Sequence, residues 1–167
     1  MPATTPQLPT PSIPARLSET SREAGLLLLR VTLGGLFIFH GTAKFAGGID
    51  GFAGYLDSLG VPLPLLNAYL AAGTEIVAGA AVALGLFTRL AAIPLAFTMA
   101  VAFVAAKGAT LSAQGGGGEY PLALGLVAMA LVLTGPGRFN LTSPLLKALG
   151  QPRPAPAADA RAAVLAA

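Results

Sequence analysis

The sequence predicts an all-α fold, a four-helix bundle that is integral to a membrane. Hydrophobic residues fill 54% of the 167 positions and charged residues only 10%, whereas a soluble domain carries about 25% charged residues. The apolar residues form four long stretches that take up most of the chain, which is typical of a multi-pass membrane protein. We therefore expect one transmembrane domain over 23–145, with a disordered cytoplasmic tail over 1–22 and a second cytoplasmic tail over 146–167.

The first span is expected at 24–45, which is close to the roughly 20 residues that a transmembrane helix needs. It contains charged or titratable side chains, although such residues are costly inside a bilayer and usually face a partner or a wet cavity. At about 100° per residue, one face of this helix, with His40 at its edge, carries Arg30, Gly34, Phe37, Gly41 and Lys44. This face should point into the bundle, and its two glycines should let another helix approach closely.

Three further spans follow. The second is expected at 63–87 and the third at 90–106, after a tight turn at 88–89. The fourth is expected at 119–135, where Pro121 falls in the first turn and is tolerated. A short amphipathic helix is expected in the connection between the first two spans, and the segment after the fourth span should lie on the membrane surface.

The basic residues predict that both termini are cytoplasmic. With the N-terminus inside, the outer ends of the spans hold only Lys44 and Lys107. The inner side holds seven basic residues: Arg16, Arg22, Arg89, Arg138, Lys147, Arg153 and Arg161. Because positive charge accumulates on the cytoplasmic side, this bias favours the N-in, C-in orientation.

Glu75 is the most informative interior residue, because it lies near the middle of the second span. It belongs to a stripe of small residues at four-residue spacing, from Ala71 to Ala83, that suits close helix packing. An unpaired carboxylate buried there would have a raised pKa and become neutral, whereas pairing with Arg30 or His40 would keep it ionised.

A second pair is expected at the outer boundary, where Lys44 and Glu119 lie at one level and Lys107 is a third candidate. The sequence singles out no catalytic residue and no metal site. The candidates for ligand binding or proton relay are Glu75, His40, Arg30, Lys44 and Glu119.

Each candidate also has a purely structural interpretation. Arg30 could extend to the inner headgroups, and Lys44 could be an interfacial anchor. Glu119 could only stabilise the start of the fourth span. Glu75 could belong to a structural ion pair.

Composition excludes several functions. The chain has no cysteine, so it has no disulfide framework, CxxC redox motif or thiolate metal site. It has a single histidine, so one subunit cannot hold a bis-histidine haem. Its net charge of +3 is spread over loops and tails, and no nucleic-acid partner is expected.

Several short motifs together resemble one known family. The first span supplies Leu29-Arg30 with Gly34 and the run from Phe39 to Phe45, and the second supplies Gly73-x-Glu75-x3-Gly79. Further motifs are the run from Gly85 to Ala92, Glu119-Tyr120-Pro121, and the run from Gly135 to Leu141. Over about 26–143 the chain resembles the DoxX family of small four-helix bacterial membrane proteins.

The resemblance implies a link to redox chemistry. Relatives include a subunit associated with thiosulfate:quinone oxidoreductase, and the family is connected with respiratory and redox-stress complexes, although many members have no assigned activity. The polar positions of the family are matched here by Arg30, His40, Lys44, Glu75 and Glu119. The location it implies is the bacterial cytoplasmic (inner) membrane.

The leading hypothesis is a subunit or accessory of a quinone-linked redox system. Quinone is then the cofactor to expect, and the partners are membrane lipid, redox partner subunits or a second copy of the chain. Whether the protein is itself an oxidoreductase subunit with activity stays open. A membrane scaffold or assembly factor is the alternative, and a small-solute or proton pathway is favoured less, because no inverted repeat of broken helices is visible.

Overall fold

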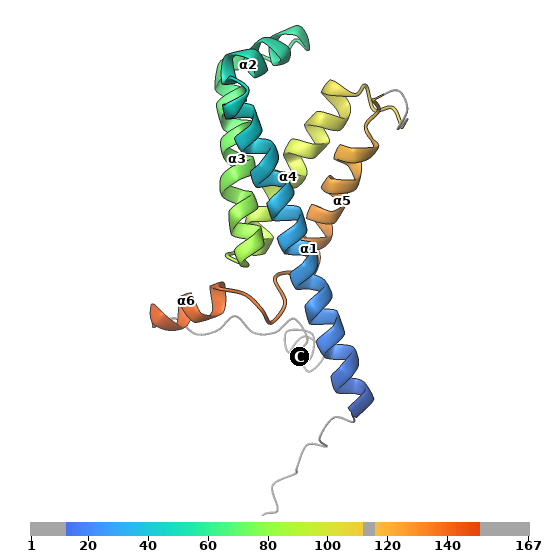
Figure 1. Cartoon of the computed structure of the whole chain (residues 1–167), viewed down its shortest axis with the longest axis vertical. Helices are drawn as coiled ribbons and strands as arrows, with labels where there is room; N and C mark the ends of the chain where they lie inside the picture. The colour runs from blue at the N-terminus through green and yellow to red at the C-terminus, as the bar shows by residue number, and fades with distance from the viewer. Residues whose placement is uncertain (1–12, 112–115, 151–167) are drawn as a thin grey trace, which may run out of the picture.

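The computed structural model describes residues 13–111 and 116–150, in which helices joined by turns and loops are the only regular secondary structure (Figure 1). Three helices are long and apolar enough to cross a membrane, and a fourth, shorter helix is also apolar. The all-α membrane bundle predicted from the sequence is therefore confirmed. The elements in order are α1 (Ile13–Ala46), α2 (Ile49–Ser58), α3 (Pro64–Leu84), α4 (Thr88–Val101), a π-helical turn η1 (Ala102–Ala106), α5 (Glu119–Thr134) and α6 (Thr142–Ala148).

The first helix begins earlier than expected. It starts at Ile13, so residues 13–22 are helical where the sequence predicts a disordered tail. Pro14 lies in the first turn, where proline is tolerated. No glycine or proline then follows until Gly25, so nothing stops the helix from extending. Residues 1–12 and 151–167 of the expected tails lie outside the described part of the chain.

The turn between α3 and α4 lies before the expected 88–89. Gly85, with φ of 72°, adopts the left-handed conformation that ends α3, and Phe87 is also left-handed with φ of 43°. Thr88 is already the first residue of α4. The glycine decides the position of the turn, because it takes a positive φ without a steric cost.

The helices α1 and α3 approach each other closely through glycine. A Cβ atom at Gly34 would collide with the carbonyl oxygen of Gly79, and one at Gly41 would lie 2.8 Å from the carbonyl oxygen of Ala72. The predicted inward face of α1 is confirmed, because Arg30, Gly34, Phe37 and Gly41 are buried and Lys44 is half-buried. The apolar core continues between the helices through Leu33, Phe37, Val82, Leu95, Ala128 and Leu131.

The bundle consists of two helix pairs, α1 with α3 and α4 with α5. Figure 1 shows that the pairs lie close together near α6 and diverge toward α2. We refer to these two regions as the α6 end and the α2 end of the bundle. In the same view α6 lies across the direction of the bundle rather than along it.

Candidate functional site

Four polar side chains meet at the α2 end of the bundle, and we call them the polar cluster: His40 and Lys44 on α1, Glu75 on α3 and Tyr120 on α5. The Nζ of Lys44 donates a hydrogen bond to Oε2 of Glu75, and the two groups form an ion pair. Only 3% of the Glu75 side chain is exposed, against 23% for Lys44. The carboxylate is therefore held inside the bundle by a cation that reaches it from the edge.

Local sequence explains this pair. Gly41 lies against Ala72 and Glu75, so the absence of a side chain there brings α1 onto α3 at the level of the carboxylate. Lys44 is in the last turn of α1, where a cation interacts favourably with the helix dipole. Its ammonium also lies 5.3 Å from the ring centre of Phe52 on α2, within cation–π range.

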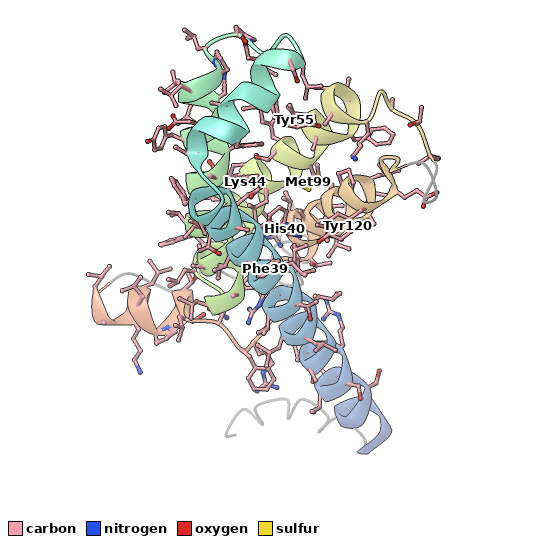
Figure 2. All side chains as sticks on the ribbon, turned by 45° about the horizontal axis from the view of Figure 1, so that its top comes forward. Phe39, His40, Lys44, Tyr55, Met99 and Tyr120 are labelled. Atoms are coloured by element: carbon pink, nitrogen blue, oxygen red, sulfur yellow. The ribbon has the colours of Figure 1, made fainter. Side chains whose placement is uncertain are left out.

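A second contact in the polar cluster joins the two helix pairs. Nε2 of His40 lies 2.8 Å from the hydroxyl oxygen of Tyr120, and their ring centroids are 5.7 Å apart. Phe39 packs edge-on against the same imidazole at 5.5 Å (Figure 2). One residue from α5 therefore completes a cluster that α1 and α3 begin.

Glu75 pairs with neither of the two partners that the sequence suggested. It pairs with Lys44, and neither Arg30 nor His40 contacts it in the described contacts. Arg30 lies more than three turns closer to the α6 end than Lys44 does, since the two are 14 residues apart on α1. Glu75 packs at the level of Gly41, eleven residues or about 16 Å along α1 from Arg30, and is out of reach of the guanidinium. Lys44 lies one turn beyond His40 on the face that α3 covers.

Arg30 instead holds a backbone segment at the α6 end. It is 1% exposed, and its two terminal nitrogens donate to the carbonyl oxygens of Pro136 and Phe139. The side chain is therefore inside the protein and does not reach for the headgroups. Sequence spacing could not reveal this role, because the acceptors are main-chain atoms more than a hundred residues away.

Two further residues fasten the same segment. Glu23, 7% exposed, accepts a hydrogen bond from the backbone N–H of Arg138. The hydroxyl of Thr142 accepts from the backbone N–H of Phe87 at 2.7 Å and donates to the carbonyl of Gly85 at 2.7 Å. We call Glu23, Arg30 and Thr142 the backbone clamp. The glycine- and proline-rich run after α5 is thereby tied to α1 and to the turn before α4.

Glu119 does not join the polar cluster. It is exposed at the start of α5, where it lines a surface hollow of about 360 Å³ together with Lys107 and Tyr120. The expected pairing of Lys44 with Glu119 is therefore wrong, because the ammonium of Lys44 is taken by Glu75. Sequence reasoning also missed Tyr120 as a site residue. Its position one residue after Glu119, at the mouth of a predicted span, was the available signal.

Comparison with known proteins identifies the family of this chain. The family model described as DoxX matches residues 25–108. This chain belongs to the DoxX family. The match includes Arg30, His40, Lys44 and Glu75, whereas Tyr120 lies beyond it.

Individual relatives of this DoxX protein are membrane proteins with little assigned function. It is 37% identical over 127 residues to the Bacillus subtilis protein named "Putative oxidoreductase CatD", and the aligned region makes up 75% of this chain and 90% of that protein. It is 33% identical over 150 residues to the Mycobacterium tuberculosis "Uncharacterized membrane protein Rv3486", covering 82% and 90% of the two chains. It is 30% identical over 127 residues to the Escherichia coli "Inner membrane protein YphA", covering 72% and 90%. No solved structure matches the chain.

The chemistry available in this DoxX protein is that of hydrogen bonding and proton exchange. The polar cluster offers a carboxylate, an ammonium, an imidazole and a phenol hydroxyl, beside the aromatic ring of Phe39. Within residues 13–111 and 116–150, no three His, Cys, Asp or Glu side chains come together as a metal site would require. The cluster could hold a polar head group that enters from the surrounding lipid, because His40 is half-buried and Tyr120 is 49% exposed.

Proposed function

We propose that this DoxX protein is a subunit or accessory of a quinone-linked redox system in the bacterial inner membrane, and that its polar cluster binds the quinone head group. The observation that carries the proposal is the contact between His40 and Tyr120, beside the ion pair of Lys44 with Glu75. The names of two relatives support it: one is named "Putative oxidoreductase CatD" and another "Inner membrane protein YphA".

The residues present fit a quinone head group. A phenol hydroxyl both donates and accepts, and an imidazole does either, depending on its tautomer. Tyr120 can turn its hydroxyl from His40 to a carbonyl oxygen of the ring, and His40 then offers a nitrogen to the same ligand. Phe39 gives the imidazole an apolar neighbour, which matches the mixture of apolar walls and few polar groups that small-molecule sites use.

Reduction of a quinone to a quinol takes up two electrons and two protons. This chain has no cysteine, so thiol chemistry within the chain cannot supply the electrons, and a partner subunit is the proposed source. The chain's own residues would handle protons: Tyr120 and His40 at the head group, with Glu75 on α3 as the further candidate for proton relay. Lys44 would hold the Glu75 carboxylate in place throughout.

The test is gentle purification of the protein from its native membrane, followed by mass spectrometry of the bound lipids. A quinone should co-purify with the wild type and be lost in His40→Ala and in Tyr120→Phe. The matched control is Tyr69→Phe, which removes the same hydroxyl from an exposed tyrosine on α3 whose ring packs on Phe45. A quinone that stays bound in both site variants, or that is absent from folded wild type, would remove the proposal.

A membrane scaffold or assembly factor is the second candidate, and one observation favours it. The charged side chains that α1 directs into the protein have partners within the chain: Glu23 and Arg30 bond to backbone groups, and Lys44 pairs with Glu75. On this alternative the interior charges only fix how the helices pair. It predicts that Glu75→Ala lowers the folded yield and the recovery of partner proteins, while the wild type carries no quinone.

A further inference from the structure

Two hollows adjoin on the lipid-facing side of the helix pair α4 and α5. The first is an apolar groove of about 240 Å³ between the two helices, and its wall residues Val104 and Leu126 are each 62% exposed. The second is a hollow of about 360 Å³ at the α2 end, whose lining includes Lys107 and Glu119. Pro121 lines both, so the charged hollow lies at one end of the apolar groove.

The two charged residues continue the two walls of the groove. On α5, Glu119 precedes the groove residue Leu126 by seven positions, a spacing that places both on one face of a helix. On the other wall, Lys107 follows the groove residue Phe103 by four positions across η1. A Cβ atom at Gly118 would overlap the ring of Phe103 and lie 3.3 Å from the Cβ of Lys107, so these two side chains face the same way. Each apolar wall therefore ends at a charge, and the two charges are opposite.

Lys107 and Glu119 have no ionic partner in the described part of the chain. Within residues 13–111 and 116–150, no ion pair joins them to each other or to another side chain. The Nζ of Lys107 lies 3.9 Å from the position of a Cβ atom on Gly116, so the ammonium is beside bare backbone. Tyr120 also lines the hollow, but its hydroxyl is bonded to His40. One hollow thus presents a positive and a negative group that do not neutralise each other.

Hydrogen bonds along the backbone hold these two charges in position. The hydroxyl of Thr110 donates to the carbonyl of Lys107 at 2.8 Å, and the carbonyl of Thr110 accepts from the N–H of Gly118 at 2.7 Å. Gly118 directly precedes Glu119, so one threonine connects both sides of the hollow. The spacing of the two charges is therefore set by the fold, before any ligand binds.

We infer that the two hollows form one binding site for phosphatidylethanolamine, with its phosphate at Lys107, its ammonium at Glu119 and an acyl chain in the groove. This head group carries the two charges that complement the hollow. A phosphatidylglycerol head group has no cation for Glu119, and a choline has no N–H to donate to a carboxylate. The hollow lies where the apolar helices end, which is the level of lipid head groups. The inference does not depend on the quinone proposal.

The experiment uses the full-length protein in phosphatidylcholine nanodiscs that contain a trace of phosphatidylethanolamine with a diazirine in its acyl chain. After irradiation and digestion, the label should be found in 96–104 and 121–129, and excess unlabelled phosphatidylethanolamine should remove it. Ala100→Phe places a ring at an exposed residue of the groove wall and should abolish this labelling. Ala105→Phe makes the same change at an exposed residue of η1 outside both linings and should leave the labelling as in wild type.

Two charge substitutions test the head group, with a phosphatidylglycerol probe of the same acyl chains for comparison. Lys107→Gln removes the partner of the phosphate, which both lipids carry, and should lower labelling by both probes roughly two- to fivefold. Glu119→Gln removes the partner of the ammonium and should lower labelling by phosphatidylethanolamine alone, by a similar factor. Lys147→Gln and Asp57→Asn make the same chemical changes at exposed residues outside the hollow and should have no effect.

Ordinary boundary lipid gives a different result. If both probes label wild type equally, or if folded Lys107→Gln and Glu119→Gln are labelled by both probes as wild type is, the hollow does not recognise the head group and the inference is wrong. Circular dichroism of each variant in the same nanodiscs establishes that it is folded. Neither result bears on the quinone proposal, because the measurements use no quinone and leave His40 unchanged.

Discussion

Replacing Lys44 should destabilise the bundle more than replacing Glu75, although the two form one ion pair. Their burial is unequal, with 3% of the Glu75 side chain exposed and 23% of the Lys44 side chain. In Lys44→Met the carboxylate stays buried and loses its counter-charge. In Glu75→Gln the ammonium can turn away from α3 toward the nearby end of α1, because a long lysine side chain reaches water easily.

The size of the asymmetry follows from these exposures. Removing one partner of a buried ion pair costs about 3–5 kcal/mol, and Lys44→Met should cost about 3 kcal/mol. Glu75→Gln keeps an acceptor oxygen for Lys44 and leaves no charge buried, so its cost should be about 1 kcal/mol, as for a single hydrogen bond. A difference of about 2 kcal/mol corresponds to roughly a thirtyfold difference in the unfolding equilibrium constant.

The assay is reversible unfolding by SDS in mixed micelles at neutral pH, followed by circular dichroism. The controls make the same chemical changes at exposed positions, Lys147→Met on α6 and Asp57→Asn on α2, and should shift the free energy of unfolding by no more than about 0.5 kcal/mol. Equal costs for the two pair variants, or a larger cost for Glu75→Gln, would refute the argument from unequal burial.

Two further predictions concern packing and the backbone clamp. Gly34→Ala should lower the free energy of unfolding by about 1–3 kcal/mol in the same assay, because its methyl group would meet the Gly79 carbonyl. The control Gly35→Ala, whose added Cβ would have nothing within 4 Å, should be neutral or slightly stabilising. A larger loss of stability in Gly35→Ala than in Gly34→Ala would contradict the close approach of α1 and α3. Arg30→Lys should lower the free energy of unfolding by about 1.5–3 kcal/mol, because a lysine cannot bond to two carbonyls as the guanidinium does. A protease should then cut the segment 135–141 faster than in wild type. Arg138→Lys, whose side chain is exposed, should change neither measurement.

The sequence was sufficient to predict the helices and the inward face of α1, for physical reasons that particular residues illustrate. Hydropathy and length identify the spans, and Pro121 and the glycines after α5 limit the last one. The 100° spacing places Arg30, Phe37 and Gly41 on one face, because a straight helix fixes side-chain direction without any knowledge of its neighbours. The N-terminal start of α1 was less accessible, since nothing between Pro14 and Gly25 marks a boundary.

Partners between helices were not predictable to the same extent. Glu75 was recognised as a buried acid, but its partner depends on how far α1 slides along α3, and Gly41 sets that register by allowing contact with Ala72. Arg30 bonds to main-chain carbonyls, which every residue carries, so no pattern in the sequence distinguishes its acceptors. The contact of Tyr120 with His40 depends on the angle between the two helix pairs, which no single helix encodes.

The two ends of the bundle use their polar groups differently, and this difference decides where a ligand can act. At the α6 end, Arg30 and Glu23 are bonded to backbone groups that no ligand can replace without opening the segment after α5. At the α2 end, His40 and Tyr120 are bonded to each other across diverging helix pairs, and a ligand that offers equivalent hydrogen bonds can exchange with that contact at small cost. Substitutions at the α6 end should therefore change mainly stability, and substitutions at the α2 end should change mainly ligand binding. Arg30→Lys should lower stability and leave the proposed head-group site intact, whereas Tyr120→Phe should abolish quinone binding in a bundle that unfolds like wild type.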